Sequence, residues 1–253
     1  MLFSVRALRL LIHLLVGLVA ALAVRLSFGR LSPQPVARWW SSSLLDVFNI
    51  QLQVSGTAFH GGRVTVANHV SWLDIPLIYA CEGTHFVAKS EIRHWPVAGW
   101  LANAAQTFYI RRGRGGAAPL LRALRPHLRR GGSVTIFPEG TTTDGQAMRP
   151  FHSRLFAAAI DANCAVQPIA IRYGHSANGE RIAPFIGDDT LVGHIVRLLR
   201  EPALQAELIY CAPIQATGLD RNELAQRAQQ AIARALEQAP PTTASVQIQP
   251  QAA

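Results

Sequence analysis

The chain has 253 residues, of which 49% are hydrophobic and 15% charged, and its formal net charge is +9. This length and apolar content suit one domain with a full hydrophobic core, and they exclude a disordered, coiled-coil or collagen-like chain. The small charged share and a mean hydropathy of +0.17 point to association with a membrane. The basic excess predicts an anionic partner.

An apolar run, Leu10–Val24, lies near the N-terminus and follows two arginines. Its 15 residues would rise only about 22 Å as a helix, against about 30 Å for the hydrocarbon core of a bilayer. The run is therefore short for a spanning helix, whereas an anchor in one leaflet needs less length, and the sequence leaves both open. A cleaved signal peptide is the alternative, because a basic start and an apolar run are typical of one.

Residues 35–48 follow the apolar run and contain two adjacent tryptophans, Trp39 and Trp40. Paired tryptophans suit the head-group level of a bilayer, but they also suit a surface helix packed on the body of the protein. We expect residues 1–48 to form a pair of membrane-anchoring helices.

From residue 50 onward, short β-type runs alternate with helical patterns. Strands are predicted at 50–54, 63–67, 85–88, 107–111, 133–137, 166–173 and 207–212. Helices are predicted at 72–80, 96–105, 117–130, 153–163, 190–199 and 220–238, the last with a capping box of Asp220 and Glu223. This alternation predicts an α/β fold with a mixed sheet flanked by helices over residues 49–238, and the polar residues 239–253 read as a disordered tail.

Basic residues are concentrated in residues 89–130, which hold nine of them and a single acid, Glu91. In the predicted helix 117–130 the leucines and the arginines fall on separate stripes. A solvated basic face would explain any single arginine, whereas the cluster favours an anionic membrane surface or substrate. Nucleic acid is disfavoured because no interleaved aromatic pattern accompanies the charge.

A histidine and an aspartate follow the predicted strand 63–67, in the order Asn68-His69-Val70-Ser71-Trp72-Leu73-Asp74. The end of a strand is where open α/β sheets present their ligand sites. A carboxylate bonded to one imidazole nitrogen leaves the other nitrogen as a base that can take a proton from an alcohol. Ser71 and Asp74 also have the spacing of a helix cap, which needs no catalysis. Two ligands alone are too few for zinc.

Two further segments suggest a binding site. Phe137-Pro138-Glu139-Gly140-Thr141-Thr142-Thr143 ends a predicted strand, and the glycine lets backbone approach a ligand closely, with its amide free to face an oxyanion. Arg111 and Arg112 end another strand, and guanidinium is the natural partner of phosphate. Because successive side chains alternate, only one of the two arginines can point into a given site.

Four blocks in this order resemble the glycerolipid acyltransferase family, to which the 1-acylglycerol-3-phosphate acyltransferases belong. The resemblance spans about residues 50–215. The blocks are His-x4-Asp at His69 and Asp74, Phe-Ile-x-Arg resembled by Tyr109, Ile110 and Arg112, Pro-Glu-Gly-Thr at residues 138–141, and an apolar strand with proline at Val166, Pro168 and Ile169.

The resemblance implies transfer of a fatty acyl group from a thioester, acyl-CoA or acyl carrier protein, to the hydroxyl of a lysolipid. His69 would be the base and Asp74 its orienting partner, while Arg112, Glu139, Gly140 and Thr141 would hold the acceptor head group. No metal and no bound cofactor are implied. The enzyme is expected at the inner membrane, with its site facing the cytoplasm.

The acceptor expected from the resemblance is 1-acylglycerol-3-phosphate, which would give phosphatidate. The family's third block commonly continues with arginine, and here that residue is Thr142. Loss of a guanidinium removes a charge-assisted contact to phosphate, worth about 1.5–3 kcal/mol. The alternatives are therefore another lysolipid such as lyso-ornithine lipid, a lipid hydrolase or transacylase with the same base, and a non-catalytic basic membrane-binding protein.

Overall fold

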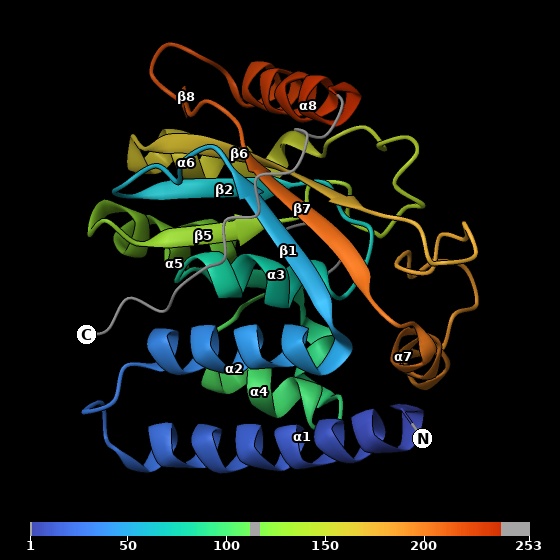
Figure 1. Cartoon of the computed structure of the whole chain (residues 1–253). Coiled ribbons are helices and arrows are strands. Elements are labelled where there is room, and N and C mark those ends of the chain that lie inside the picture. The colour runs from blue at the N-terminus through green and yellow to red at the C-terminus, as the bar shows by residue number, and fades with distance from the viewer. Residues whose placement is uncertain (1, 112–116, 239–253) are drawn as a thin grey trace.

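The computed structural model describes residues 2–111 and 117–238, which build a mixed sheet covered by helices on both faces (Figure 1). The described strands form one eight-stranded sheet in the order β1-β7-β6-β2-β5-β3-β4, with β8 paired to β6. β7 and β8 run antiparallel to β6, and the other pairs are parallel. The strands are β1 (Ile50–Ser55), β2 (Arg63–Ala67), β3 (His85–Lys89), β4 (Phe108–Ile110), β5 (Ser133–Ile136), β6 (Ala165–Tyr173), β7 (Leu204–Tyr210) and β8 (Ile214–Gln215).

Helices connect these strands and cover the sheet. The α-helices are α1 (Leu2–Leu26), α2 (Pro33–Phe48), α3 (Asp74–Cys81), α4 (Ala98–Ala104), α5 (Ala117–Arg129), α6 (Ala157–Ala162), α7 (Leu191–Arg200) and α8 (Arg221–Glu237). Two short 3₁₀ helices, η1 (Ser90–His94) and η2 (Ser153–Phe156), complete the described elements.

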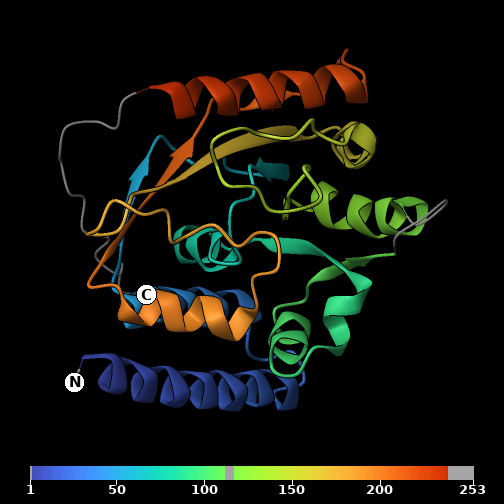
Figure 2. The same cartoon turned by 90° about the vertical axis from the view of Figure 1, so that its right-hand side faces the viewer.

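The sheet separates two hydrophobic cores, because successive side chains of a strand point to opposite faces. On β6, Ile169 and Ile171 pack with α2, α3 and α7, whereas Val166 and Ala170 pack with α5, α6 and α8. Helices α3, α2 and α1 lie in succession beyond one face, and α8 covers the other (Figures 1 and 2).

The predicted α/β fold with a mixed sheet is confirmed. Each predicted strand is present within a few residues, and the capping box of α8 forms between Asp220 and Glu223. β8 and η1 were not predicted, since two residues of strand and one turn of 3₁₀ helix leave no periodic pattern. The tail 239–253 lies outside the described residues.

Helix α1 is longer than the apolar run that the sequence singled out. Its 25 residues rise about 37 Å, and Phe3–Leu26 is the one helix in the described chain that is long and apolar enough to cross a bilayer. The helix includes Arg6, which faces the protein and donates from its guanidinium to the carbonyl oxygens of Glu201 and Pro202. The whole of α1 is therefore long enough to span a bilayer, although the apolar run alone is not.

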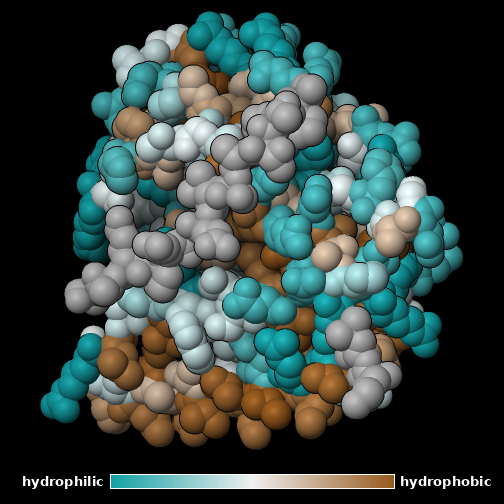
Figure 3. All heavy atoms as spheres, viewed as in Figure 1, coloured by the Kyte–Doolittle hydropathy of each residue, from teal (hydrophilic) through white to brown (hydrophobic). Residues whose placement is uncertain are grey.

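One face of α1 packs on the protein, and the other is exposed and mostly apolar. The inward face is formed by Arg6, Leu10, His13, Gly17 and Ala21. Figure 3 shows hydrophobic residues along the edge of the molecule where α1 lies. The exposed apolar residues of this face include Val5, Leu8, Leu11, Ile12, Leu15, Val19, Leu22 and Leu26.

Of the two tryptophans of α2, Trp39 is exposed and Trp40 packs against α1. Trp39 is 53% exposed, while Trp40 stacks on His13 with ring centroids 4.7 Å apart and donates its indole N–H to the His13 carbonyl at 3.1 Å. Gly17 makes this contact feasible, because a Cβ there would lie 2.4 Å from Nε1 of Trp40. The indole ring of Trp40, packed over Gly17, therefore holds α1 and α2 together.

Candidate active site

The candidate site lies where three adjacent parallel strands end. His69 follows β2, the loop from Phe137 follows β5, and Tyr173 closes β6. β2 pairs in parallel with both neighbours, with Val66 opposite Ile136 on one side and Pro168 on the other. The carboxyl ends of the three strands therefore bring together residues that are up to 104 positions apart in the sequence.

The predicted pair of His69 and Asp74 is in contact. Nδ1 of His69 lies 2.8 Å from Oδ2 of Asp74; the imidazole side chain is 18% exposed and the carboxylate is fully buried. The carboxylate accepts the proton on Nδ1, so the lone pair of the imidazole is on Nε2. Phe137 stacks on the ring with centroids 3.9 Å apart and an interplanar angle of 13°, which shields one face of the imidazole from water.

Asp74 is fixed by three further hydrogen bonds. Its Oδ2 accepts the backbone N–H groups of Val70 at 2.8 Å and Ser71 at 3.0 Å, and its Oδ1 accepts the phenol of Tyr173 at 2.7 Å. The helix-cap alternative for Ser71 does not hold, because Leu73 is the N-cap of α3 and makes no side-chain cap hydrogen bond. The carboxylate instead organises the turn that carries the imidazole.

Glu139 links the turn that carries His69 to the loop after β5. Its Oε1 accepts the N–H of His69 at 2.8 Å, and its Oε2 accepts the N–H of Arg149 at 2.8 Å. The residue is 3% exposed, and burial raises the pKa of Glu139 above its ordinary value although both N–H donors act to lower it. These bonds give Glu139 a role in positioning the backbone of His69.

The Gly140–Thr142 turn differs in detail from its expected use. Gly140 has φ of 71°, and its N–H donates to the Phe137 carbonyl at 3.1 Å, so this amide is not directed at an oxyanion. Thr141 is half-buried on the same turn. The hydroxyl of Thr142 donates to the carbonyl of Phe185, which ties the turn to the segment before α7.

Of the two arginines after β4, only Arg111 lies within the described residues. Arg111 is exposed. Arg112, the expected head-group ligand, lies outside the described residues, so its role stays a prediction. Of the predicted site residues, hydrogen bonds join His69 to both Asp74 and Glu139, and Gly140 and Thr141 directly follow Glu139 in the chain.

Two contributors to the site were missed by the sequence reasoning. Tyr173 was predicted only as the end of a strand, and Asn68 only as part of a motif. The side chain of Asn68 donates to the carbonyl of Ile171 at 2.9 Å and accepts its N–H at 2.8 Å, which joins the turn that carries His69 to β6. A polar residue at the end of each neighbouring strand was the signal that could have found both.

The arrangement can perform general-base catalysis on a hydroxyl group. The buried carboxylate sets the tautomer of His69, the aromatic ring shields it, and Nε2 can accept a proton. Among the described residues, no group of three or more His, Cys, Asp or Glu side chains is placed to hold a metal ion.

Comparison with known proteins gives the class of this chain. A family model described as "Acyltransferase" matches residues 50–172. A lyso-ornithine lipid O-acyltransferase of Pseudomonas aeruginosa is 47% identical over 203 residues, covering 80% of this chain and 79% of the relative. A 1-acyl-sn-glycerol-3-phosphate acyltransferase of Neisseria gonorrhoeae is 35% identical over 193 residues, covering 74% and 75%.

The fold has a solved counterpart. The crystal structure of a 1-acyl-sn-glycerophosphate acyltransferase from Thermotoga maritima superposes with a TM-score of 0.63 at 20% identity, covering 92% of this chain and 96% of that one. The fold and the sequence relatives together define an acyltransferase. The chain belongs to the glycerolipid acyltransferase family, as the four sequence blocks predicted.

Proposed function

We propose that this enzyme attaches to a membrane and transfers a fatty acyl group from a thioester to the hydroxyl of a lyso-ornithine lipid. The observation that carries the catalytic part is the 2.8 Å contact between His69 and a fully buried Asp74. The acceptor, given above as an alternative, is supported by the 47% identical relative with that name and by Thr142 in place of a phosphate-binding arginine.

The reaction follows from the geometry of the dyad. Nε2 of His69 takes the proton of the acceptor hydroxyl as its oxygen attacks the thioester carbonyl. The tetrahedral oxyanion collapses to the new ester and expels the thiolate, which takes the proton from the imidazolium. Asp74 holds the imidazole in one orientation and stabilises its charged form during the transfer. General-base catalysis of this kind raises the rate by about 10²–10⁴.

The shape of α1 supports attachment within one leaflet. A helix that spans a bilayer meets lipid around most of its surface, whereas α1 places Arg6 and His13 against the protein along one side. Its other side is exposed and mostly apolar, with Arg9 and Arg25 as the exposed charges near its two ends. Each leucine buried in lipid contributes about 1.5–3 kcal/mol, so this face alone supplies firm attachment.

The donor and the location follow from the same proposal. Both acyl-CoA and acyl carrier protein are cytoplasmic thioesters, which places the enzyme on the cytoplasmic face of the inner membrane. A second acceptor, 1-acylglycerol-3-phosphate, is favoured by the relative from Neisseria gonorrhoeae. The basic segment 89–130 would face anionic lipid or an anionic carrier protein.

Release of free thiol by the purified full-length enzyme tests the proposal. Acyl-CoA and acyl carrier protein donors would each be combined with lyso-ornithine lipid, 1-acylglycerol-3-phosphate or no acceptor. We expect acceptor-dependent release that is fastest with lyso-ornithine lipid and falls about 10²- to 10⁴-fold in His69→Ala. Equal release without acceptor would identify a hydrolase, and a fully active His69→Ala enzyme would exclude the assigned base.

A further inference from the structure

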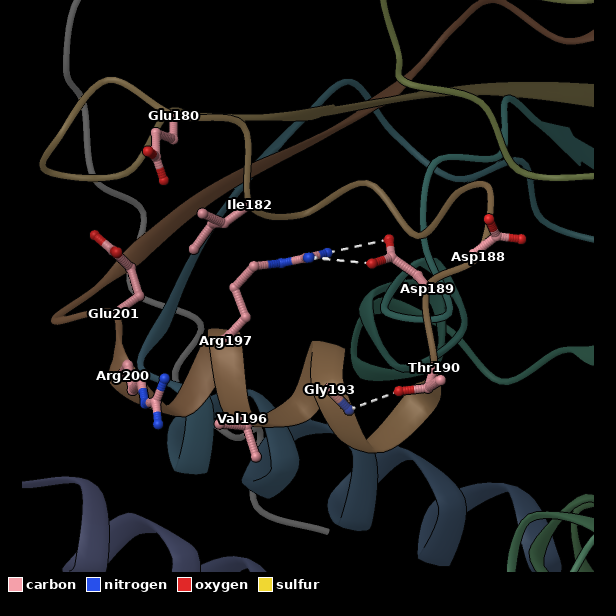
Figure 4. A pocket seen from close by; sticks show the side chains of 10 residues that line it. All are labelled: Glu180, Ile182, Asp188, Asp189, Thr190, Gly193, Val196, Arg197, Arg200 and Glu201. Atoms are coloured by element: carbon pink, nitrogen blue, oxygen red, sulfur yellow. Dashed lines mark hydrogen bonds and ion pairs between the residues drawn. The ribbon is translucent and has the colours of Figure 1, made fainter.

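A pocket of about 540 Å³ lies between residues 180–190 and α7 (Figure 4), and His69 is not among the residues that line it. Its apolar floor includes Ile182 and Val196. Its charged lining residues are Glu180, Asp188, Asp189, Arg197, Arg200 and Glu201. Four of these six are acidic, in a protein whose net charge is +9, so the pocket departs from the charge of the rest of the molecule.

The charges at one end of the pocket are available to a ligand. Arg197 is neutralised by Asp189, with both nitrogen–oxygen contacts at 3.1–3.2 Å, and Asp188 points away from the hollow (Figure 4). Glu180 and Glu201 extend at the same end, beside Arg200 (Figure 4). The net result is one positive and two negative side chains around an apolar floor.

A tight turn fixes the spacing of the two glutamates. Oε1 of Glu201 accepts the N–H of Ala177 at 2.8 Å, and the carbonyl of Glu180 accepts the N–H of Ser176 at 2.8 Å. Glu180 and Glu201 are therefore held on one local framework although they come from different segments. The other carboxylate oxygen of Glu201 can still accept a hydrogen bond from a ligand.

The pocket lies beside the apolar helix that we propose to enter the membrane. Arg6 of α1 donates to the backbone carbonyl of Glu201, and the guanidinium of Arg200 lies 5.7 Å from the ring centroid of Phe3. A pocket joined to the first turns of a helix lying in the membrane surface is at the depth of lipid head groups.

The pocket is also joined to the catalytic turn. The N–H of Phe185 donates to the carbonyl of Val70 at 2.9 Å, and Val70 is the residue after His69. Ile182, which lines the pocket, is three residues before Phe185, a chain distance of at most about 11 Å. The segment that lines the pocket is therefore tied by a hydrogen bond to the turn that carries His69.

We propose that this pocket binds the zwitterionic head group of the acceptor, with a primary ammonium between Glu180 and Glu201 and a carboxylate on Arg200. This inference rests on the proposed function, and it names the site at which the enzyme would recognise the acceptor lipid. Ornithine linked through one amine carries the other amine and a carboxylate, which match this pattern of charges. A phosphate head group has no ammonium and would be repelled by the two glutamates.

The test compares two acceptors in kinetics of the full-length enzyme. The variants are Glu180→Gln/Glu201→Gln and Arg200→Gln, and the matched control is Glu237→Gln at the end of α8. We expect the double variant to raise KM for lyso-ornithine lipid at least about tenfold with kcat within about twofold. KM for 1-acylglycerol-3-phosphate should stay the same or fall. Unchanged KM values, or equal losses for both acceptors, would overturn the assignment.

A binding measurement separates this inference from the proposed function. In the His69→Ala background, which removes the base, the protein would be sedimented with phosphatidylcholine vesicles with and without lyso-ornithine lipid. We expect the lyso-ornithine lipid to increase binding, and the double glutamate variant to abolish that increase. An increase that survives the double variant contradicts the pocket, whereas a wild-type enzyme that acylates no lysolipid contradicts only the proposed function.

Discussion

Tyr173 donates its phenol hydrogen to Asp74, with 2.7 Å between Oη and Oδ1. Burial raises the pKa of Tyr173 well above its ordinary value, and the neighbouring carboxylate raises it further, so the phenol remains a donor at any physiological pH. Tyr173→Phe leaves Oδ1 of Asp74 without this donor. A hydrogen bond to a charged group is worth about 1.5–3 kcal/mol, so we expect kcat/KM to fall about 10- to 100-fold.

Kinetics of a double variant distinguish positioning from a general loss of structure. If Tyr173 acts through Asp74, adding Tyr173→Phe to Asp74→Ala should cost little more than Asp74→Ala alone. Tyr210→Phe, a buried tyrosine on β7, serves as the matched control and should retain activity. Additive losses in the double variant would show that Tyr173 does not work through the carboxylate.

Glu139 cannot be replaced by its isosteric amide. Both of its carboxylate oxygens accept a backbone N–H, from His69 and from Arg149, and a glutamine would turn an NH₂ group toward one of them. We expect Glu139→Gln to lower kcat by about 10- to 100-fold and the free energy of unfolding by about 1–3 kcal/mol. Steady-state kinetics and denaturant unfolding measure the two effects, with the exposed Glu237→Gln as control. Full activity in Glu139→Gln would mean that the link between the two loops is dispensable.

The contact between His69 and Asp74 could be predicted because the two residues are only five positions apart, within one turn. The strands could be predicted because their patterns are local. The contact of Tyr173 with Asp74 spans 99 positions and depends on β6 lying next to β2. No alternation of apolar residues specifies the order of strands in a sheet. The contacts of Arg6 could not be predicted for a similar reason, since its carbonyl partners come from residues 201 and 202.

We expect the free energy of unfolding to fall on acidification because of the buried side chain of His194. Its Nδ1 accepts the indole N–H of Trp72 at 2.9 Å, and its Nε2 donates to the carbonyls of Ile182 and Ala183 at 3.0 and 3.1 Å, so the native imidazole is neutral. Burial lowers the pKa of His194, and Arg197 lowers it further. The unfolded state therefore binds more protons as the pH falls below about 6.5, and stability is lost from there down to the lowered native pKa.

Denaturant unfolding between pH 5 and pH 8 checks this sign. We expect His194→Gln to be less stable than the parent at pH 8 but to lose less stability on acidification. Replacing the exposed His60 by glutamine should leave the parent's pH dependence unchanged. A pH dependence that is identical in His194→Gln and in the parent would assign the effect to other groups.

The two faces of α1 should respond to mutation in opposite ways. Gly17→Ala puts a methyl group 2.4 Å from Nε1 of Trp40, so we expect the free energy of unfolding to fall by about 1–3 kcal/mol while vesicle binding persists. Leu11→Ala/Leu15→Ala on the exposed face should leave unfolding almost unchanged and weaken vesicle partitioning by at least about tenfold, because each leucine contributes about 1.5–3 kcal/mol in lipid. Unfolding in detergent-free solution and sedimentation with vesicles measure the two effects. A helix that spanned the bilayer would instead keep both variants in the membrane, since many other apolar residues would remain in its core.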